Sequence, residues 1–235
     1  MKTLKITLAA LAMAAAASSF AQEAEESEGP TGWTPLAVGV ATPVQLPWGI
    51  DRWDIKGLDV NLFYADAPNL QGLIVSLGGT QVRREFAGAA VGGLFNCSRG
   101  DVYGLRVTAG ANVNPGGIYG VDVDAFGMRD NVHGVDVNIL ASAQRNQCGL
   151  QVSGLANVTA VESYGCTIAG LANLARTAYG LQLAVVYNMT DDLHGAQIGL
   201  VNYADNCLNG GFQVGLVNII LSNKIKVLPF LNGYF

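Results

Sequence analysis

Charged residues are scarce in this chain of 235 residues, at 13% of the sequence against roughly 25% in an average soluble domain. Basic residues are fewer than acidic ones, with 13 Lys and Arg against 18 Asp and Glu, and the formal net charge is −5. Because the chain has no basic surface for phosphates, a nucleic-acid partner is not expected. Half of the residues are hydrophobic, so the composition also excludes a disordered chain.

Motifs of catalysis and of metal binding are missing as well. There is no nucleotide-binding loop, no Gly-x-Ser-x-Gly elbow and no Cys/His spacing typical of zinc sites. The two histidines, His133 and His194, each come directly before a glycine, where related positions carry Tyr. We interpret both as interface or turn residues rather than metal ligands. We therefore predict that the protein is not an enzyme and has no catalytic residue, no cofactor and no metal site.

The N-terminus has the features of a targeting segment. Lys2 and Lys5 precede an apolar run over residues 6–17, which is too short to span a bilayer. Ser19 and Ala21 then place small residues before a cleavage site. We predict a signal peptide over residues 1–21, an acidic flexible linker over 22–32 and a single β-repeat domain over 33–235. Loss of the two lysines changes the net charge from −5 to −7.

An internal repeat organises the rest of the chain. The phrase GAQIGLVN at residues 195–202 returns as GFQVGLVN at 211–218, and weaker copies start at earlier glycines. The eleven copies start at Gly57, Gly72, Gly88, Gly104, Gly120, Gly134, Gly149, Gly165, Gly180, Gly195 and Gly211. A nearly fixed period of 14 to 16 residues means that one repeat is one structural unit.

Each copy alternates with a period of two residues. After Gly180, Leu181 and Leu183 occupy one face, and Gln182 and Ala184 occupy the other. This alternation predicts one strand per repeat, with a bulky apolar face and a small or polar face.

Strands are also predicted at both ends of the array, and no stretch after residue 21 has a helical period. The first covers residues 35–46, where Pro43 indicates an edge position or a kink, and the last covers 226–235. Four short polar runs between the strands, at residues 98–101, 114–117, 129–131 and 190–192, are predicted turns.

Two all-β architectures fit this pattern. We expect an antiparallel up-and-down barrel of outer-membrane type, because strands with one apolar face and the terminal aromatic Phe235 are typical of such barrels. Counting gives thirteen strands, but bacterial barrels prefer even numbers, so twelve or fourteen strands are expected. The alternative is a parallel β-solenoid with one coil per repeat, in which the recurring Gly and Asn residues stack as ladders. A straight strand of nine residues spans roughly 30 Å, so a solenoid requires bends inside each repeat.

Four aspartates and four cysteines remain. Asp59, Asp122, Asp124 and Asp136 lie on the polar face of their strands; we interpret them as a solvated face, with a cation-friendly lumen or Ca²⁺ ligation as the alternative. The cysteines are Cys97, Cys148, Cys166 and Cys207. Export permits disulfides, and four cysteines allow three pairings, so one bridge between loops and four free thiols both remain open.

The repeats have a family resemblance. Residues 180–218, together with the terminal segment 229–235, resemble a family of bacterial surface-repeat proteins whose arrays read GLQ[IL]GLVN every fifteen or so residues. The opening at 34–46 and the copy at 57–62 also resemble that family. The likeness is specific in the last three repeats and weaker between Gly72 and Gly134, where Asp and Arg replace Gln. It implies an exported surface or outer-membrane protein and implies no activity, so no functional residue is carried over.

The expected function follows from export and repetition. We predict a protein of the cell outer membrane or cell surface with a structural or pore-like role. Its partner would be outer-membrane lipid, with a possible extracellular ligand or small solutes. The alternative is a surface-attached or secreted β-solenoid that acts as an adhesion or binding module.

Overall fold

All regular structure in the described part of the protein is β-structure. The structure is a computed structural model that describes residues 30–50 and 52–234. The predicted signal peptide, most of the predicted linker and Phe235 lie outside these residues. The chain divides into an N-terminal unit, which ends at Gly134, and a C-terminal unit, which begins at Val135. The single repeat domain over 33–235 stays a prediction.

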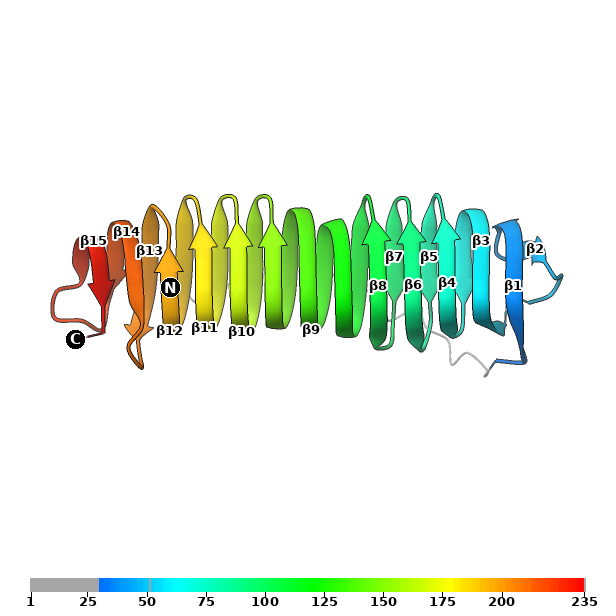
Figure 1. Cartoon of the computed structure of the whole chain (residues 1–235), viewed down its shortest axis with the longest axis horizontal. Coiled ribbons are helices and arrows are strands. Elements are labelled where there is room, and N and C mark those ends of the chain that lie inside the picture. Colours follow the sequence, from blue (N-terminus) through cyan, green and yellow to red (C-terminus); the bar gives the residue numbers. More distant parts are fainter. Residues whose placement is uncertain (1–29, 51, 235) are drawn as a thin grey trace. The chain divides into compact units, whose positions relative to one another are not determined.

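The N-terminal unit consists of stacked coils (Figure 1). Its strands are β1 (Gly32–Ala41), β2 (Val44–Leu46), β3 (Trp53–Ala67), β4 (Leu70–Ser76), β5 (Gly79–Val82), β6 (Phe86–Gly92), β7 (Phe95–Ser98), β8 (Val102–Thr108) and the first part of β9 (Ala111–Ser153). One parallel ladder runs from β3 through β4, β6 and β8 to β9. A second runs from β3 through β5 and β7 to β9. Each coil therefore contributes to two sheet faces.

The C-terminal unit repeats this arrangement more regularly. It contains the rest of β9, then β10 (Ala156–Ala169), β11 (Ala172–Ala184), β12 (Tyr187–Ile198), β13 (Val201–Cys207), β14 (Phe212–Ile220) and β15 (Val227–Gly233). Equivalent residues of successive repeats face each other, so that Gly165 pairs with Gly180 and Asn173 with Asn188. Only β15 runs antiparallel to its neighbour, β14.

The pairing direction decides between the two predicted architectures. Successive repeats pair in parallel, whereas an up-and-down barrel requires antiparallel neighbours. The sheet is therefore that of a β-solenoid of about ten turns, and the expected barrel is wrong. The alternative is confirmed, together with its stacked Gly and Asn residues. The count of thirteen strands is also wrong, because bends divide several repeats and give fifteen strands in the described residues.

The bend that the solenoid requires lies between two ladders of fixed register. Gln182 pairs with Gln197, and Asn188 pairs with Asn202. Asn188 lies six residues after Gln182, but Asn202 lies only five residues after Gln197. The turn at Gly199 and Leu200 absorbs the difference, because both flanking ladders keep their register.

The glycine that opens each repeat is required by close packing between coils. At Gly180, φ is +114°, and an added Cβ atom would lie 2.2 Å from the carbonyl oxygen of Gly165 in the coil before. A side chain is excluded both by this contact and by the backbone conformation.

Several predicted boundaries need correction. The strand predicted at 35–46 is a hairpin of β1 and β2 with its turn at Thr42 and Pro43, in agreement with the kink expected from Pro43. The polar runs 114–117, 129–131 and 190–192 are strand rather than turn. Within the last run, Thr190 and Asp192 stay in the ladder and face Ala175 and Thr177 of the coil before. The strand predicted at 226–235 is confirmed as β15.

The apolar core is a stack inside one corner of the coil. In the N-terminal unit, Ile55, Leu70, Phe86, Val102 and Ile118 are successive partners in the ladder, and all are buried. In the C-terminal unit the core is smaller and includes Leu193, Cys207 and Ile220. The remaining interior is largely polar.

Candidate binding surface

Ladders of polar side chains fill the interior of the C-terminal unit. The Nε2 atom of Gln197 donates to Oε1 of Gln182 at 2.8 Å, and Gln213 donates to Gln197 at the same distance. The second ladder is made of Asn157, Asn173, Asn188, Asn202 and Asn218, linked by amide hydrogen bonds of 2.8–3.0 Å. Each of these asparagines also donates to a backbone carbonyl oxygen. These interactions satisfy amides that would otherwise be costly to bury.

Alternate residues of a strand point in opposite directions, so the apolar residues between the inward Gln and Asn residues point outward. Each coil has a first flank, the strand after the repeat Gly, and a second flank, the strand after the bend. The first flank presents Leu150, Val152, Ile168, Leu181, Leu183, Ile198, Phe212 and Val214, and the second presents Ala156, Val158, Ala172, Leu174, Tyr187, Val201, Tyr203, Val217 and Ile219. All are partly exposed or exposed.

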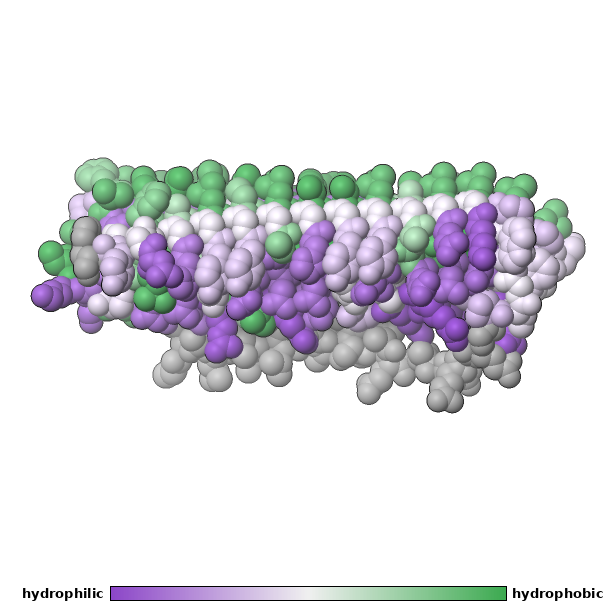
Figure 2. Space-filling model, turned by 60° about the horizontal axis from the view of Figure 1, so that its bottom comes forward, coloured by the Kyte–Doolittle hydropathy of each residue, from purple (hydrophilic) through white to green (hydrophobic). Residues whose placement is uncertain are grey.

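The bend between the flanks forms an apolar edge. This edge, the apex, consists of Leu155, Leu171, Val186, Leu200 and Leu216, which are 41–59% exposed. Figure 2 shows hydrophobic side chains as a continuous green band along this side of the unit. The apex and the two flanks together are called the apolar wedge. Contiguous apolar surfaces of this extent mark interaction sites in soluble proteins.

Between residues 135 and 221, the solvent-accessible charged side chains lie on the side of the unit opposite the wedge. Between residues 135 and 221 the charged residues are Asp136, which is buried, and Arg145, Glu162, Arg176, Asp191, Asp192 and Asp205. The last six lie in the corner that follows the second flank. This corner and the segment that leads to the next repeat Gly form the base. The wedge therefore carries no formal charge.

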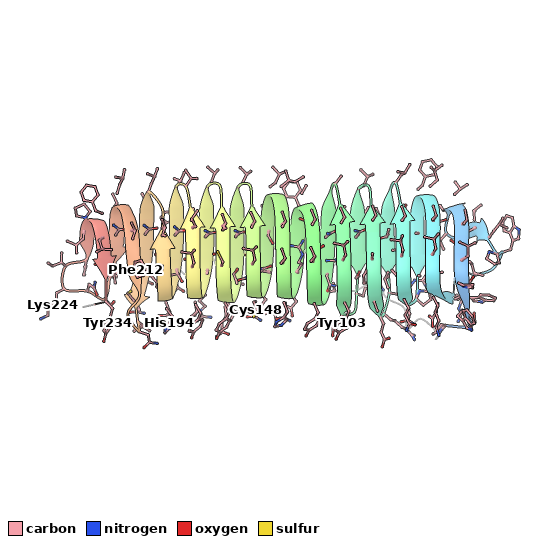
Figure 3. The ribbon with its side chains drawn as sticks, in the orientation of Figure 1. Tyr103, Cys148, His194, Phe212, Lys224 and Tyr234 are labelled. Atoms are coloured by element: carbon pink, nitrogen blue, oxygen red, sulfur yellow. The ribbon has the colours of Figure 1, made fainter. Side chains whose placement is uncertain are left out.

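Aromatic rings stack on the base, directly before the repeat glycines. In the C-terminal unit, the rings of Tyr164 and Tyr179 are 4.4 Å apart, and His194, which is labelled in Figure 3, stacks on Tyr179 at 4.5 Å. Asn209 contacts Nδ1 of His194 at 3.1 Å. The N-terminal unit has its own stack, in which His133 lies on Tyr119 at 5.0 Å. The two histidines thus occupy Tyr positions in the stacks, as the sequence indicated.

The interior of the N-terminal unit differs because it contains ion pairs between charged side chains. Arg106 pairs with Asp122 at 2.7 Å, and Arg129 contacts both Asp122 and Asp124. Burial alone would raise the pKa of Asp122, but Arg106 and Arg129 lower it below its ordinary value. Because Arg106 and Asp122 face each other in consecutive repeats, sequence periodicity could have indicated this pair. The contribution of Arg129 was missed because its segment was predicted to be a turn.

The prediction that the four aspartates lie on a solvated face is therefore wrong. Asp59, Asp122, Asp124 and Asp136 are all buried with no exposed surface. Ser142 donates to Asp136 at 2.8 Å, and Asn61 donates to Asp59 at 2.7 Å. The Oδ2 atom of Asp59 has no hydrogen-bond partner. Burial, followed by the charge of Asp66, raises the pKa of Asp59 to about 7.

The cysteines form no disulfide in the described residues. Cys97, Cys148, Cys166 and Cys207 are all free, so the bridge between loops that was left open is not observed. Cys148 is exposed, whereas Cys207 is buried, and burial raises the pKa of Cys207. Cys166 lies in a Leu column of the first flank, where it is paired with Leu181.

The described residues contain neither a membrane-spanning helix nor a metal site. Within residues 30–50 and 52–234, no helix is long and apolar enough to cross a membrane, and no three His, Cys, Asp or Glu side chains form a group suited to a metal ion. Comparison of the chain with protein-family models, curated proteins and solved structures found no match.

Proposed function

We propose that the protein is an exported β-solenoid of the cell surface that acts as an adhesion or binding module. The observation that supports this proposal is the apolar wedge of the C-terminal unit. Its side chains repeat in register from coil to coil, and none of them carries a formal charge. A surface of this kind is suited to association with another apolar surface.

The pore-like role is not carried into the proposal. It depended on a barrel lumen, whereas the interior of the C-terminal unit is filled by hydrogen-bonded Gln and Asn side chains. A catalytic role is not carried into the proposal either, because the described side chains of the wedge are apolar apart from the hydroxyl groups of Tyr187 and Tyr203, and the amides behind them are directed inward. Export and surface location enter from the N-terminal sequence and from the resemblance to surface-repeat proteins.

Two matched variants test the binding role. The apex variant carries Leu171→Asp and Leu200→Asp, at side chains that are 50% and 45% exposed. The base variant carries Val161→Asp and Leu208→Asp, at side chains that are 37% and 38% exposed. Both add two negative charges at partly exposed aliphatic positions, but only the apex variant alters the wedge.

The test is adhesion of bacterial cells that express the full chain. Antibody labelling of intact cells measures display, and retention on alkyl-coated glass measures binding. We expect display of all three proteins, with strong retention for the wild type and the base variant and weak retention for the apex variant. Displayed wild-type protein that adds no retention, or an apex variant that is retained equally, would refute the proposal.

A further inference from the structure

The apolar wedge has dimensions and a charge distribution that point to one class of partner. We infer that the apex and both flanks of the C-terminal unit insert edge-on into one leaflet of a lipid bilayer, with the base left in water. This inference rests on the proposed function, because it assigns an occupant to the same surface.

The depth of the wedge corresponds to one leaflet. The first flank and apex of one coil extend from Leu181 to Val186, which spans about 16 Å at roughly 3.3 Å per residue. The hydrocarbon core of a bilayer is about 30 Å thick, so that one leaflet provides about 15 Å.

The residues below the flank suit the membrane interface. Tyr179 lies directly before Gly180, at the base end of the same strand, and stacks between Tyr164 and His194. Tyr side chains are enriched where an apolar region meets water. The charged residues follow on the base, where Asp205 accepts a hydrogen bond from the hydroxyl group of Tyr203 at 2.5 Å, at the lower end of the second flank.

The backbone of the apex meets the main requirement of a lipid environment, which is internal hydrogen bonding. The amide of Leu171 donates to the carbonyl oxygen of Leu155 at 2.8 Å, and that of Val201 donates to Val186 at 2.9 Å. The amide of Val217 donates to Leu200 at 3.0 Å. Successive bends are therefore bonded coil to coil, as the flanking strands are. Inside, the Asn157 to Asn218 ladder and the links from Gln182 to Gln213 are hydrogen-bonded along the stack, whereas the buried Gln144 side chain has no partner among the described residues.

A bilayer also covers the wedge more completely than a second copy of the chain. A flat face of another solenoid would contact one flank and leave the other flank and the apex in water. Lipid chains surround an inserted edge and contact all three surfaces. The absence of basic residues from the wedge indicates hydrocarbon contact rather than attraction to anionic headgroups, so uncharged vesicles are the appropriate probe.

Flotation of the purified full chain with phosphatidylcholine vesicles is the first test. We expect the wild type and the base variant to float with the vesicles. Each Asp placed in hydrocarbon should reduce partitioning at least about tenfold, so the apex variant should bind at least about 100-fold more weakly. Circular dichroism of all three proteins checks that the fold is unchanged.

Insertion depth is measured with single tryptophans. Leu171→Trp places a reporter on the apex, and Val161→Trp places one on the base. Vesicles with brominated acyl chains should quench the added fluorescence of the first protein and not of the second. The wild type gives the background signal of Trp33, Trp48 and Trp53, which all belong to the N-terminal unit.

The outcomes separate this inference from the proposed function. If cells adhere to alkyl-coated glass through the apex but the purified chain does not bind vesicles, the binding role is supported and lipid insertion is refuted. If the wild type sediments as a dimer, the apex variant sediments as a monomer and neither binds vesicles, a second copy of the chain is the occupant and lipid insertion is refuted. Failure of both adhesion and flotation would refute both proposals.

Discussion

The stability of the N-terminal unit should depend on the ionisation of Asp59. This carboxyl group is fully buried, and its pKa is raised from 3.8 to about 7. The folded state therefore retains a proton that the unfolded chain releases at about pH 4. Between pH 4 and 7 the native state binds more protons, so the free energy of unfolding decreases as pH rises. The stabilisation is fully present below the unfolded pKa and is lost above the folded pKa.

The magnitude follows from the size of the shift. Each pKa unit corresponds to about 1.4 kcal/mol, so a shift from 3.8 to about 7 gives a loss on the order of 4 kcal/mol across this window. Asp59→Asn keeps the shape of the side chain and removes the titration. The variant should be stabilised relative to the wild type at pH 8 by up to this amount, and it should differ little at pH 4.5.

Tryptophan fluorescence during urea unfolding is a suitable assay, because Trp33, Trp48 and Trp53 all report on the N-terminal unit. Glu85→Gln is the matched control, since this side chain is exposed in the same unit. The control should keep the pH profile of the wild type, whereas Asp59→Asn should flatten it. An unchanged slope between pH 4 and 7 in Asp59→Asn would refute the assignment to this carboxyl group.

Three further predictions concern the solenoid itself. Asn188→Ala removes the link between Asn173 and Asn202 and should destabilise the C-terminal unit by about 2–4 kcal/mol because buried amide groups lose partners, measured as faster hydrogen exchange in β11 to β13. Gly180→Ala should cost about 3 kcal/mol or more in thermal unfolding, whereas Gly210→Ala, at φ +77° with no atom within 4 Å of the added Cβ, should cost about 1 kcal/mol; equal losses would contradict the role of close packing. Cys148 should react with a maleimide in the folded protein and Cys207 only after unfolding, and mass spectrometry of the two peptides can measure this difference.

The repeat unit and the faces of its strands could be predicted from the sequence, but the parallel pairing of strands in successive repeats could not. The period of about 15 residues identified the unit, and the alternation around Gln182 identified which side chains share a face. A barrel and a solenoid both place such polar residues inside and apolar ones outside. The difference lies in whether Gly165 and Gly180 belong to parallel or antiparallel neighbours, and alternation within one strand does not depend on that choice. The copy at residues 149–157 has one residue more than the copy at 195–202, but a bend in a solenoid and a bulge in a barrel strand would both produce this difference.

The candidate surface was harder to predict because it depends on where the coil bends. Leu155 and Leu200 lie six and five residues after their repeat glycines, so strict alternation would place them on opposite faces, and only the bend places both on one edge. The buried aspartates were misjudged for a related reason. Asp122 belongs to a polar face that encloses a small interior, so its charge requires Arg106 and Arg129 as partners rather than water.

Much of the hydrophobic content of the C-terminal unit lies outside its core. A coil of about 15 residues turns only alternate side chains inward, and in the C-terminal unit the Gln and Asn ladders take many of those places. The apolar core that remains is a narrow stack around Leu193 and Cys207. Most Leu, Val and Ile residues of that unit therefore lie on its exterior, where the part of each side chain that stays in water adds no stability to an isolated molecule. This exposed hydrocarbon surface contributes only when the edge is removed from water. The fold thus provides a reason for association, and the depth of the edge favours lipid as the partner.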